Sequence, residues 1–80
     1  MKLFRLSQSE NNGYDTYDSC IVCALTIDEA RAIHPGGGEC KETPDQWDSW
    51  CGLHDVEVEY IGEAVDALKK GVICASFNAG

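Results

Sequence analysis

Residues 19–33, SCIVCALTIDEARAI, join two patterns with different periods. The first seven of them are apolar and rich in β-compatible side chains, which predicts a central strand over residues 19–25. A capping box follows the strand, because the Thr26 hydroxyl can accept from the Glu29 amide while the Glu29 carboxylate reaches back to the Thr26 amide. The strand is therefore expected to lead directly into a helix.

The helix is expected to run from Ile27 to about Ile33. Pro35 ends it, because a proline disfavours helical geometry at the residue before it, His34. Ile27, Ala30 and Ile33 would then share one buried stripe.

Further strands are expected on both sides of this unit. Residues 2–7 alternate between apolar and polar side chains, which predicts a first strand paired antiparallel with residues 19–25. Residues 56–61 alternate valine with glutamate and predict a half-buried strand, and residues 71–77, GVICASF, predict the last one. Residues 63–70 suit a short helix with Val65 and Leu68 inward and Gly71 as its cap.

The expected order is ββαβ(α)β within a single domain over residues 1–80. This predicts an α+β fold, with a small antiparallel sheet of about four strands and one or two short helices on one face. Residues 35–54 show no apolar periodicity and contain three consecutive glycines, so we expect a long surface loop with room for one helical turn over residues 44–50. A loop of that length is usually functional.

The charge of the chain limits its partners. Fourteen acidic and six basic residues give a formal net charge of −8, and residues 39–66 hold nine of the acids against Lys41 alone. Such acidity excludes a nucleic-acid backbone or an anionic membrane as the main partner, because both repel a polyanion. We found neither an apolar run of membrane-spanning length nor a secretory signal, so a cytoplasmic location in a host cell is expected.

Two interpretations of the acidic stretch stay open: a solubilising surface, or a set of carboxylates offered to a basic site on another protein. Aromatic rings flanked by carboxylates favour the second, because rings supply contact area and carboxylates pair with cations. The partner-binding residues predicted on this basis are Asp15, Asp18, Asp45, Trp47, Asp48, Trp50, Glu57 and Glu59. The alternative for the two tryptophans is a lid folded back over a small core, and the two roles are compatible.

The five cysteines are an odd number in a chain without an export signal, so we expect reduced thiols that act as small buried hydrophobic residues. Cys20 and Cys23 lie three residues apart on a predicted strand, which points their sulfur atoms to opposite faces and disfavours a shared zinc or redox site. Cys74, within an apolar strand, is expected to be buried as well.

A second arrangement has the spacing of a metal site. His34, Cys40, Cys51 and His54 follow the pattern H-x5-C-x10-C-x2-H, and two such pairs of ligands could close a tetrahedral zinc site. We keep zinc as an alternative to the absence of any cofactor. Cys51 and His54 are also close enough for nucleophilic catalysis, but no oxyanion-hole loop or third orienting group accompanies them, so no enzyme is predicted.

The blocks MKLFRLSQSENNGYDTYDSCIVCA, DEARAIHP, SWC, VEVEYIGEA and GVICASFNAG resemble a family of very small proteins from phages, prophages and bacteria. The resemblance extends over nearly the whole chain, with a variable part at about residues 36–46, and includes His34 and the Trp50–Cys51 pair but not Cys40. It implies no activity and no catalytic residues. It implies a context, in which small acidic phage proteins bind and block host machinery, including CRISPR effectors, sometimes with carboxylates that imitate nucleic-acid phosphates.

The function expected from the sequence is that of a non-enzymatic, anti-CRISPR-like inhibitor whose carboxylates occupy the basic surface of a host nucleic-acid-binding protein. A CRISPR effector is one such partner, and neither nucleic acid nor a membrane is bound directly. Two alternatives stay open, a zinc-stabilised interaction module and a binder of a small molecule such as a nucleotide signal. The latter would stack its ligand on Tyr14, Tyr17, Trp47 and Trp50 and would need Arg5, Arg31 or Lys41 for the phosphates. The oligomeric state is left open.

Overall fold

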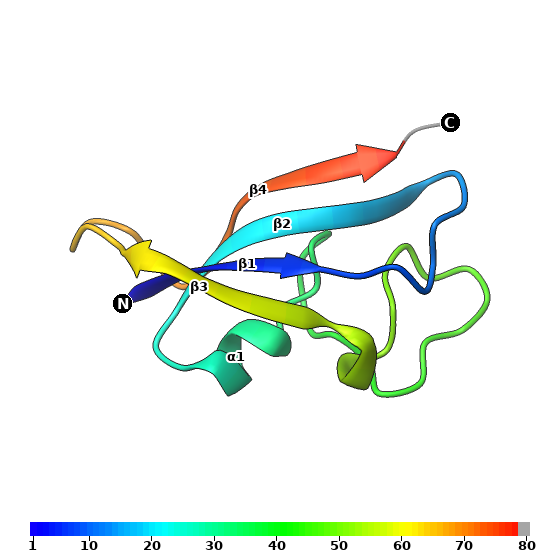
Figure 1. Cartoon of the computed structure of the whole chain (residues 1–80), viewed down its shortest axis with the longest axis horizontal. Coiled ribbons are helices and arrows are strands. Elements are labelled where there is room, and N and C mark those ends of the chain that lie inside the picture. Colours follow the sequence, from blue (N-terminus) through cyan, green and yellow to red (C-terminus); the bar gives the residue numbers. More distant parts are fainter. Residues whose placement is uncertain (79–80) are drawn as a thin grey trace.

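The computed structural model describes residues 1–78, so Ala79 and Gly80, the end of the GVICASFNAG block, lie outside the described residues. Four strands form one antiparallel sheet in the order β3-β1-β2-β4 (Figure 1). The strands are β1 (Lys2–Ser7), β2 (Thr16–Ala24), β3 (Glu57–Glu63) and β4 (Gly71–Asn78). The helical elements are α1 (Ile27–Arg31) and the short 3-10 turn η1 (Leu53–Asp55). The four-strand antiparallel sheet is confirmed, but the fold is mostly β.

The centre of the sheet follows the predicted alternation. Phe4 and Leu6 of β1 are buried, while Arg5 between them is exposed. β2 begins three residues earlier than the predicted strand, at Thr16, because its first residues pair with the end of β4. The β1–β2 hairpin therefore forms the middle of the sheet, and β3 and β4 are its edges.

The helix begins as its sequence predicts. The Thr26 hydroxyl accepts from the Glu29 amide at 3.1 Å, but the Glu29 carboxylate accepts from the Leu25 amide instead of the Thr26 amide. The helix is a single five-residue turn that ends at Arg31. Ala30 is buried as expected, whereas Ile27 is 52% exposed, so the predicted buried stripe is wrong at its first position.

The second predicted helix is absent from the described residues. Between β3 and β4 the chain makes a turn with one hydrogen bond, from the Leu68 amide to the Val65 carbonyl, and Val65 is 69% exposed. A short helix is stable in water only when an apolar face packs against something, and this turn offers none. Gly71 has a φ of 138° and begins β4. Residues 44–50 also form a turn and no helix.

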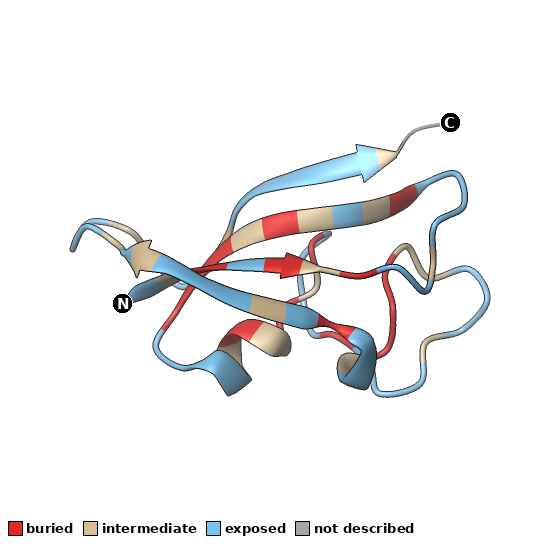
Figure 2. Ribbon diagram, viewed as in Figure 1, coloured by how far each residue is buried: buried red, intermediate tan, exposed pale blue. Residues whose placement is uncertain are grey.

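One core lies between the sheet and the elements that cover a single face of it (Figures 1 and 2). α1 supplies only part of this cover. The rest comes from residues 32–56, which we call the covering segment, and the sequence predicted residues 35–54 of it as a surface loop. The core residues are Phe4, Leu6, Cys20, Val22, Ala24, Ala30, Ile33, Cys40, Trp50, Cys51 and Val56.

The cover does not extend along all of β3. Val56, just before the strand, is 3% exposed, whereas Tyr60 is 54% and Ile61 47% exposed. The predicted half-buried strand is therefore buried at Val56 and partly buried at Val58, which packs against the core, whereas Tyr60 and Ile61 are largely exposed. Within residues 1–78, no helix is long and apolar enough to cross a membrane.

The contrast between the two tryptophans gives a direct stability prediction. Trp50 has no exposed surface, while Trp47 is 85% exposed. Trp50→Ala should lower the free energy of unfolding by about 3–5 kcal/mol, and Trp47→Ala by less than about 0.5 kcal/mol. Urea denaturation of both variants measures the difference. Equal effects would contradict the role of Trp50 as the largest side chain of the core.

Candidate binding site

The buried side chain of Gln8 organises the loop that follows β1. Its Oε1 accepts from the amides of Glu10 and Asn11, both at 2.8 Å, and its Nε2 donates to the carbonyls of Asn11 and Tyr17 at 2.8 and 2.9 Å. If β1 were longer, its backbone groups would make such bonds; here the Gln8 side chain makes all four. One side-chain amide therefore makes four of the hydrogen bonds that hold the loop between β1 and β2.

Asn11 connects this loop to the covering segment. Its Nδ2 donates to the carbonyls of Asp48 and Trp50, at 2.8 and 3.1 Å, and the amide of Tyr17 donates to the Ser49 carbonyl at 2.8 Å. These three bonds join residues more than thirty positions apart and fix the backbone on both sides of Trp50.

A histidine–carboxylate pair fixes the same stretch from the other side. The Gly36 amide donates to His34 Nδ1 at 2.9 Å, so the proton of a neutral ring lies on Nε2, which donates to Asp48 Oδ1 at 2.8 Å. The same oxygen accepts from the Trp50 amide at 3.1 Å. Asp48, with 8% of its side chain exposed, therefore holds this stretch of backbone in place, and its predicted role in partner binding stays a prediction.

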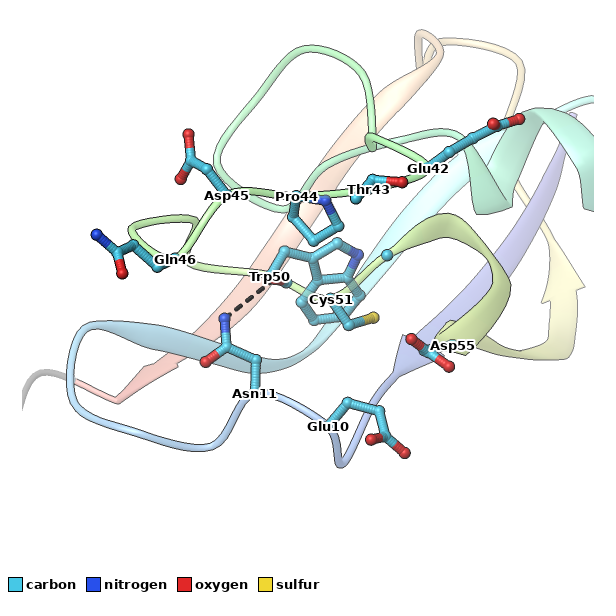
Figure 3. Close-up of a pocket in the computed structure, with 11 residues that line it drawn as sticks. Glu10, Asn11, Glu42, Thr43, Pro44, Asp45, Gln46, Trp50, Cys51 and Asp55 are labelled. Carbon is cyan, nitrogen blue, oxygen red and sulfur yellow. Dashed lines mark hydrogen bonds between the residues drawn. The ribbon is translucent and has the colours of Figure 1, made fainter.

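The backbone around Trp50, which the hydrogen bonds of Asn11 and Asp48 hold in place, forms part of the wall of a pocket of about 440 Å³ (Figure 3). Four carboxylates surround it, and no lysine, arginine or histidine lines it. Asp45 is the only predicted partner-binding residue among these four; Glu10, Glu42 and Asp55 were missed. The lining residues are Glu10, Asn11, Glu42, Thr43, Pro44, Asp45, Gln46, Trp50, Cys51, Gly52 and Asp55.

Close backbone contact makes the pocket wall rigid. The Leu53 amide donates to the Lys41 carbonyl at 2.9 Å, and a Cβ atom at Gly52 would lie only 2.8 Å from the Glu42 carbonyl oxygen. Only glycine fits at that approach without a shift of the backbone. The two halves of the covering segment therefore pack directly against each other beside the pocket.

A second depression of about 400 Å³ adjoins the first and shares Asn11 and Gln46 with it. It is lined by the two most exposed aromatic side chains, Trp47 at 85% and Tyr14 at 79%, together with Asp15 and Asp48. Trp47 and Asp15, each predicted as a partner-binding residue, thus line the same depression. We call the two depressions with their carboxylates the acidic pocket region.

The remaining predicted residues lie elsewhere. Trp50 is buried in the core, so it is a lid residue as the alternative proposed and is unavailable to a partner. Glu57 and Glu59 are exposed on β3, where Glu59 lies directly across from Arg5. Asp18 is exposed at an irregularity of β2 beside β4.

The acidic residues of the middle third do not form one continuous face. Because β3 runs antiparallel to β1, Glu57 lies beside Ser7 at one end of the sheet and Glu63 beside Lys2 at the other. Asp66 follows in the turn beyond that second end (Figure 1). Within residues 1–78 the ion pairs are His34–Asp48 and the exposed Lys70–Glu29 contact at 3.5 Å, so the carboxylates at the pocket are not neutralised internally.

The residues predicted to bind zinc are not assembled into a site. His34 uses both ring nitrogens in hydrogen bonds, Cys40 Sγ lies 3.6 Å from the Cys51 carbonyl, and His54 is exposed on η1. Among the described residues, no three His, Cys, Asp or Glu side chains are placed to hold a metal ion together. Nothing in the arrangement supports the zinc-stabilised module.

Four of the five thiols are buried as predicted, but Cys74 is exposed, so that prediction is wrong for the edge strand. Burial, and after it the effect of Cys74, raises the pKa of Cys20 to about 12. Burial, with the nearby Cys40, raises the pKa of Cys51 to about 12. Burial and then Asp48 raise the pKa of the Cys40 thiol. A thiolate nucleophile at Cys51 is therefore disfavoured at neutral pH.

No protein-family model, curated protein or solved structure matches this chain. The resemblance to small phage proteins accordingly stays a prediction.

Thiol accessibility gives a prediction for the whole fold. At pH 8 one thiol per chain, Cys74, should react rapidly with a disulfide reagent, because it alone among the five cysteines is exposed and a raised pKa keeps Cys20, Cys40 and Cys51 protonated. All five should react after denaturation. Counting the released chromophore measures this. Rapid reaction of two or more thiols in the native protein would contradict the described burial.

The His34–Asp48 contact predicts energetic coupling. Removing either side chain leaves the other polar group half-buried without its partner, so His34→Ala and Asp48→Ala should each destabilise the fold. The double variant should lose less than the sum, with a coupling of about 1–2 kcal/mol. Urea denaturation of all four proteins measures it, and Glu42→Ala, which removes an exposed carboxylate of the covering segment, is the control. Purely additive losses would contradict the bond.

Proposed function

We propose that this protein is a non-enzymatic binding module whose acidic pocket region occupies a lysine- and arginine-rich surface of another protein. The observation that carries this proposal is a pocket with four carboxylates at its wall and no basic residue among those that line it. Carboxylates that line one pocket create a negative potential when no basic side chain of the same chain neutralises them. This potential attracts and orients a positively charged partner.

The exposed aromatic rings support a protein partner. Trp47 and Tyr14 lie beside the carboxylates and expose most of their surface. A guanidinium group can stack on such a ring while it pairs with a neighbouring carboxylate, and aromatic residues are frequent energetic centres of protein interfaces. The hydrogen bonds of Asn11 and Asp48 hold this surface in place before a partner arrives, which reduces the entropy lost on binding.

The same geometry disfavours the alternative of a nucleotide-signal binder. That function needs a basic side chain at the ligand, but Arg5, Arg31 and Lys41 do not line either depression. Arg31 Nη1 instead donates to the Val56 carbonyl at 2.7 Å. Two of the four proposed stacking rings are also engaged, since Trp50 is buried and Tyr17 packs edge-on against Phe77 with 4.8 Å between ring centroids.

The class of partner follows from its charge. Proteins that bind nucleic acid carry stripes of Lys and Arg that match phosphate groups, and carboxylates at a pocket rim can pair with the same side chains. We therefore propose a nucleic-acid-binding protein as the partner, with inhibition by occupation of its basic groove. A CRISPR effector in the cytoplasm of a host cell, the partner implied by the resemblance to phage proteins, belongs to this class.

A charge-neutralisation experiment tests the proposal. The variant Glu42→Gln/Asp45→Asn/Asp55→Asn removes three charges at the pocket, and the matched control Glu59→Gln/Glu63→Gln/Asp66→Asn removes three on β3 and the turn beyond it. Binding to an oligo-arginine peptide should weaken at least tenfold in the pocket variant and less than about threefold in the control, because the field is local at physiological salt.

Fluorescence anisotropy of the labelled peptide measures both variants and the salt dependence. Affinity should fall steeply as salt increases. Equal weakening in the two variants would mean that net charge alone attracts the peptide, and it would contradict a site at the pocket. Binding that is insensitive to salt would contradict the electrostatic mechanism.

A further inference from the structure

β4 differs from the other three strands because it carries no charge. Its eight residues, GVICASFN, contain no Asp, Glu, Lys, Arg or Pro. The strand pairs only with β2, so its other edge presents backbone N–H and C=O groups without a strand partner among the described residues. Proteins commonly protect such an edge with charged residues, with proline or with a covering element. Two irregularities in the pairing with β2, at Asp18 of β2 and between Val72 and Cys74 of β4, are the protective features among the described residues.

The side chains of β4 are also left uncovered. Five consecutive residues, 73–77, are exposed, and they include Ile73 at 44% and Phe77 at 46%. In a strand, consecutive side chains point to opposite faces, so a run of five exposed residues means that neither face is fully covered there, although the Phe77 ring packs edge-on against Tyr17. Figure 2 shows this strand in the colour of exposed residues along most of its length.

The opposite edge of the sheet has the reverse character. β3 carries Glu57, Glu59 and Glu63, all exposed. If β3 paired with β3 of another copy, carboxylates of both chains would lie near one another, which is unfavourable. Of the two edges, β4 is therefore the one that tolerates a second copy of this acidic chain.

We propose that β4 pairs antiparallel with β4 of a second copy and forms a dimer with a continuous eight-stranded sheet. Two-fold symmetry requires that one residue lie directly across from its own copy, since bonded and non-bonded pairs alternate along the ladder. The strand spans residues 71–78, so the fullest overlap places the axis at Cys74 or Ala75.

Charge complementarity supports this occupant. Lys69 and Lys70 immediately precede β4, whereas Asp15 and Asp18 lie beside its other end, where the Asp15 amide donates to the Asn78 carbonyl at 2.6 Å. An antiparallel pair brings the start of one β4 to the end of the other. Lys69, which has no ion pair among the described residues, then faces aspartates of the other copy, once at each end of the interface. Lys70 lies beside it and contacts Glu29 of its own chain at 3.5 Å, and the strands between the two ends meet without charge.

The interface is small, because it consists mainly of one strand pair and the exposed side chains at its two faces. Contacts of that size are usually weak and transient. We therefore expect a concentration-dependent dimer with a dissociation constant on the order of micromolar. The 440 Å³ pocket has no residue of β4 in its lining and stays accessible in each copy, whereas Asp15 of the second depression faces the other copy.

Cross-linking through Cys74 tests the proximity of the two strands. Cys74 is the exposed one of the five cysteines, so a short bismaleimide should link two chains through it alone. The yield of covalent dimer should rise with protein concentration before saturating, and Cys74→Ser should abolish it. Covalent dimer at no more than the yield of a monomeric carrier protein with one surface cysteine would overturn the proposal.

Sedimentation equilibrium of charge-swap variants tests the arrangement. Lys69→Glu/Lys70→Glu should raise the dissociation constant about tenfold, because each of the two ends then holds like charges. Adding Asp18→Lys should restore most of the affinity, which a loss of folding could not explain.

Ile73→Lys should also weaken the dimer, while Ile61→Lys, the same change at similar exposure on β3, should not. A monomer at about millimolar concentration, or equal effects of the two isoleucine variants, would contradict pairing through β4.

Discussion

The packing of Trp50, a residue of the covering segment, into the core is the contact on which the rest of the structure depends. A chain of 80 residues buries only about 60% of its unfolded surface, so each large apolar side chain matters. α1 contributes one fully buried residue, Ala30, within its five. The single helix is therefore too small to cover Phe4, Leu6 and Val22, and the covering segment supplies the remaining layer with Trp50 as its largest side chain.

A segment without regular structure can form such a layer only if its backbone polar groups find partners. Here side chains provide many of them. Gln8 satisfies four groups of the neighbouring loop, Asn11 satisfies two carbonyls beside the tryptophan, and Asp48 binds both His34 and the Trp50 amide. The same bonds position the carboxylates of the acidic pocket region. The architecture of the core and the geometry of the candidate site thus have one origin.

The features that could be predicted from sequence are those set by local physics. The bounds of β1 agree with its alternation, and the Thr26 cap lies where its residue type predicts. The features that were missed arise from contacts distant in sequence. Gln8 and Asn11 look like ordinary polar loop residues until the chain brings them to residues 17, 48 and 50. Trp50 and Asp48 belong to the same acidic, aromatic stretch as Trp47, and only the tertiary structure separates the buried ones from the exposed one. Cys74 is the opposite case. Its apolar strand predicted a buried thiol, but β4 lies at the edge of the sheet and the thiol is exposed.

The distribution of charge gives β3, β4 and the acidic pocket region different roles. β3 and the pocket carry carboxylates that repel a second copy and attract cations, whereas β4 is neutral and bordered by lysines on one side and aspartates on the other. The acidic and the neutral surfaces coexist in a small domain because the core occupies only one face of the sheet. The acidic pocket region can act as a prearranged surface only if the covering segment is as stable as the sheet itself.

Native-state hydrogen exchange tests that requirement most directly. The amides of Tyr17, Cys40 and Leu53 bond to carbonyls of the covering segment or the residues flanking it, at 2.8, 2.7 and 2.9 Å. They should exchange with the same opening free energy as the β1–β2 amides, within about 1 kcal/mol, because the segment and the sheet share one core and unfold together. Exchange of Cys40 and Leu53 at the rates of an unstructured loop, while β1 and β2 stay protected, would contradict the account.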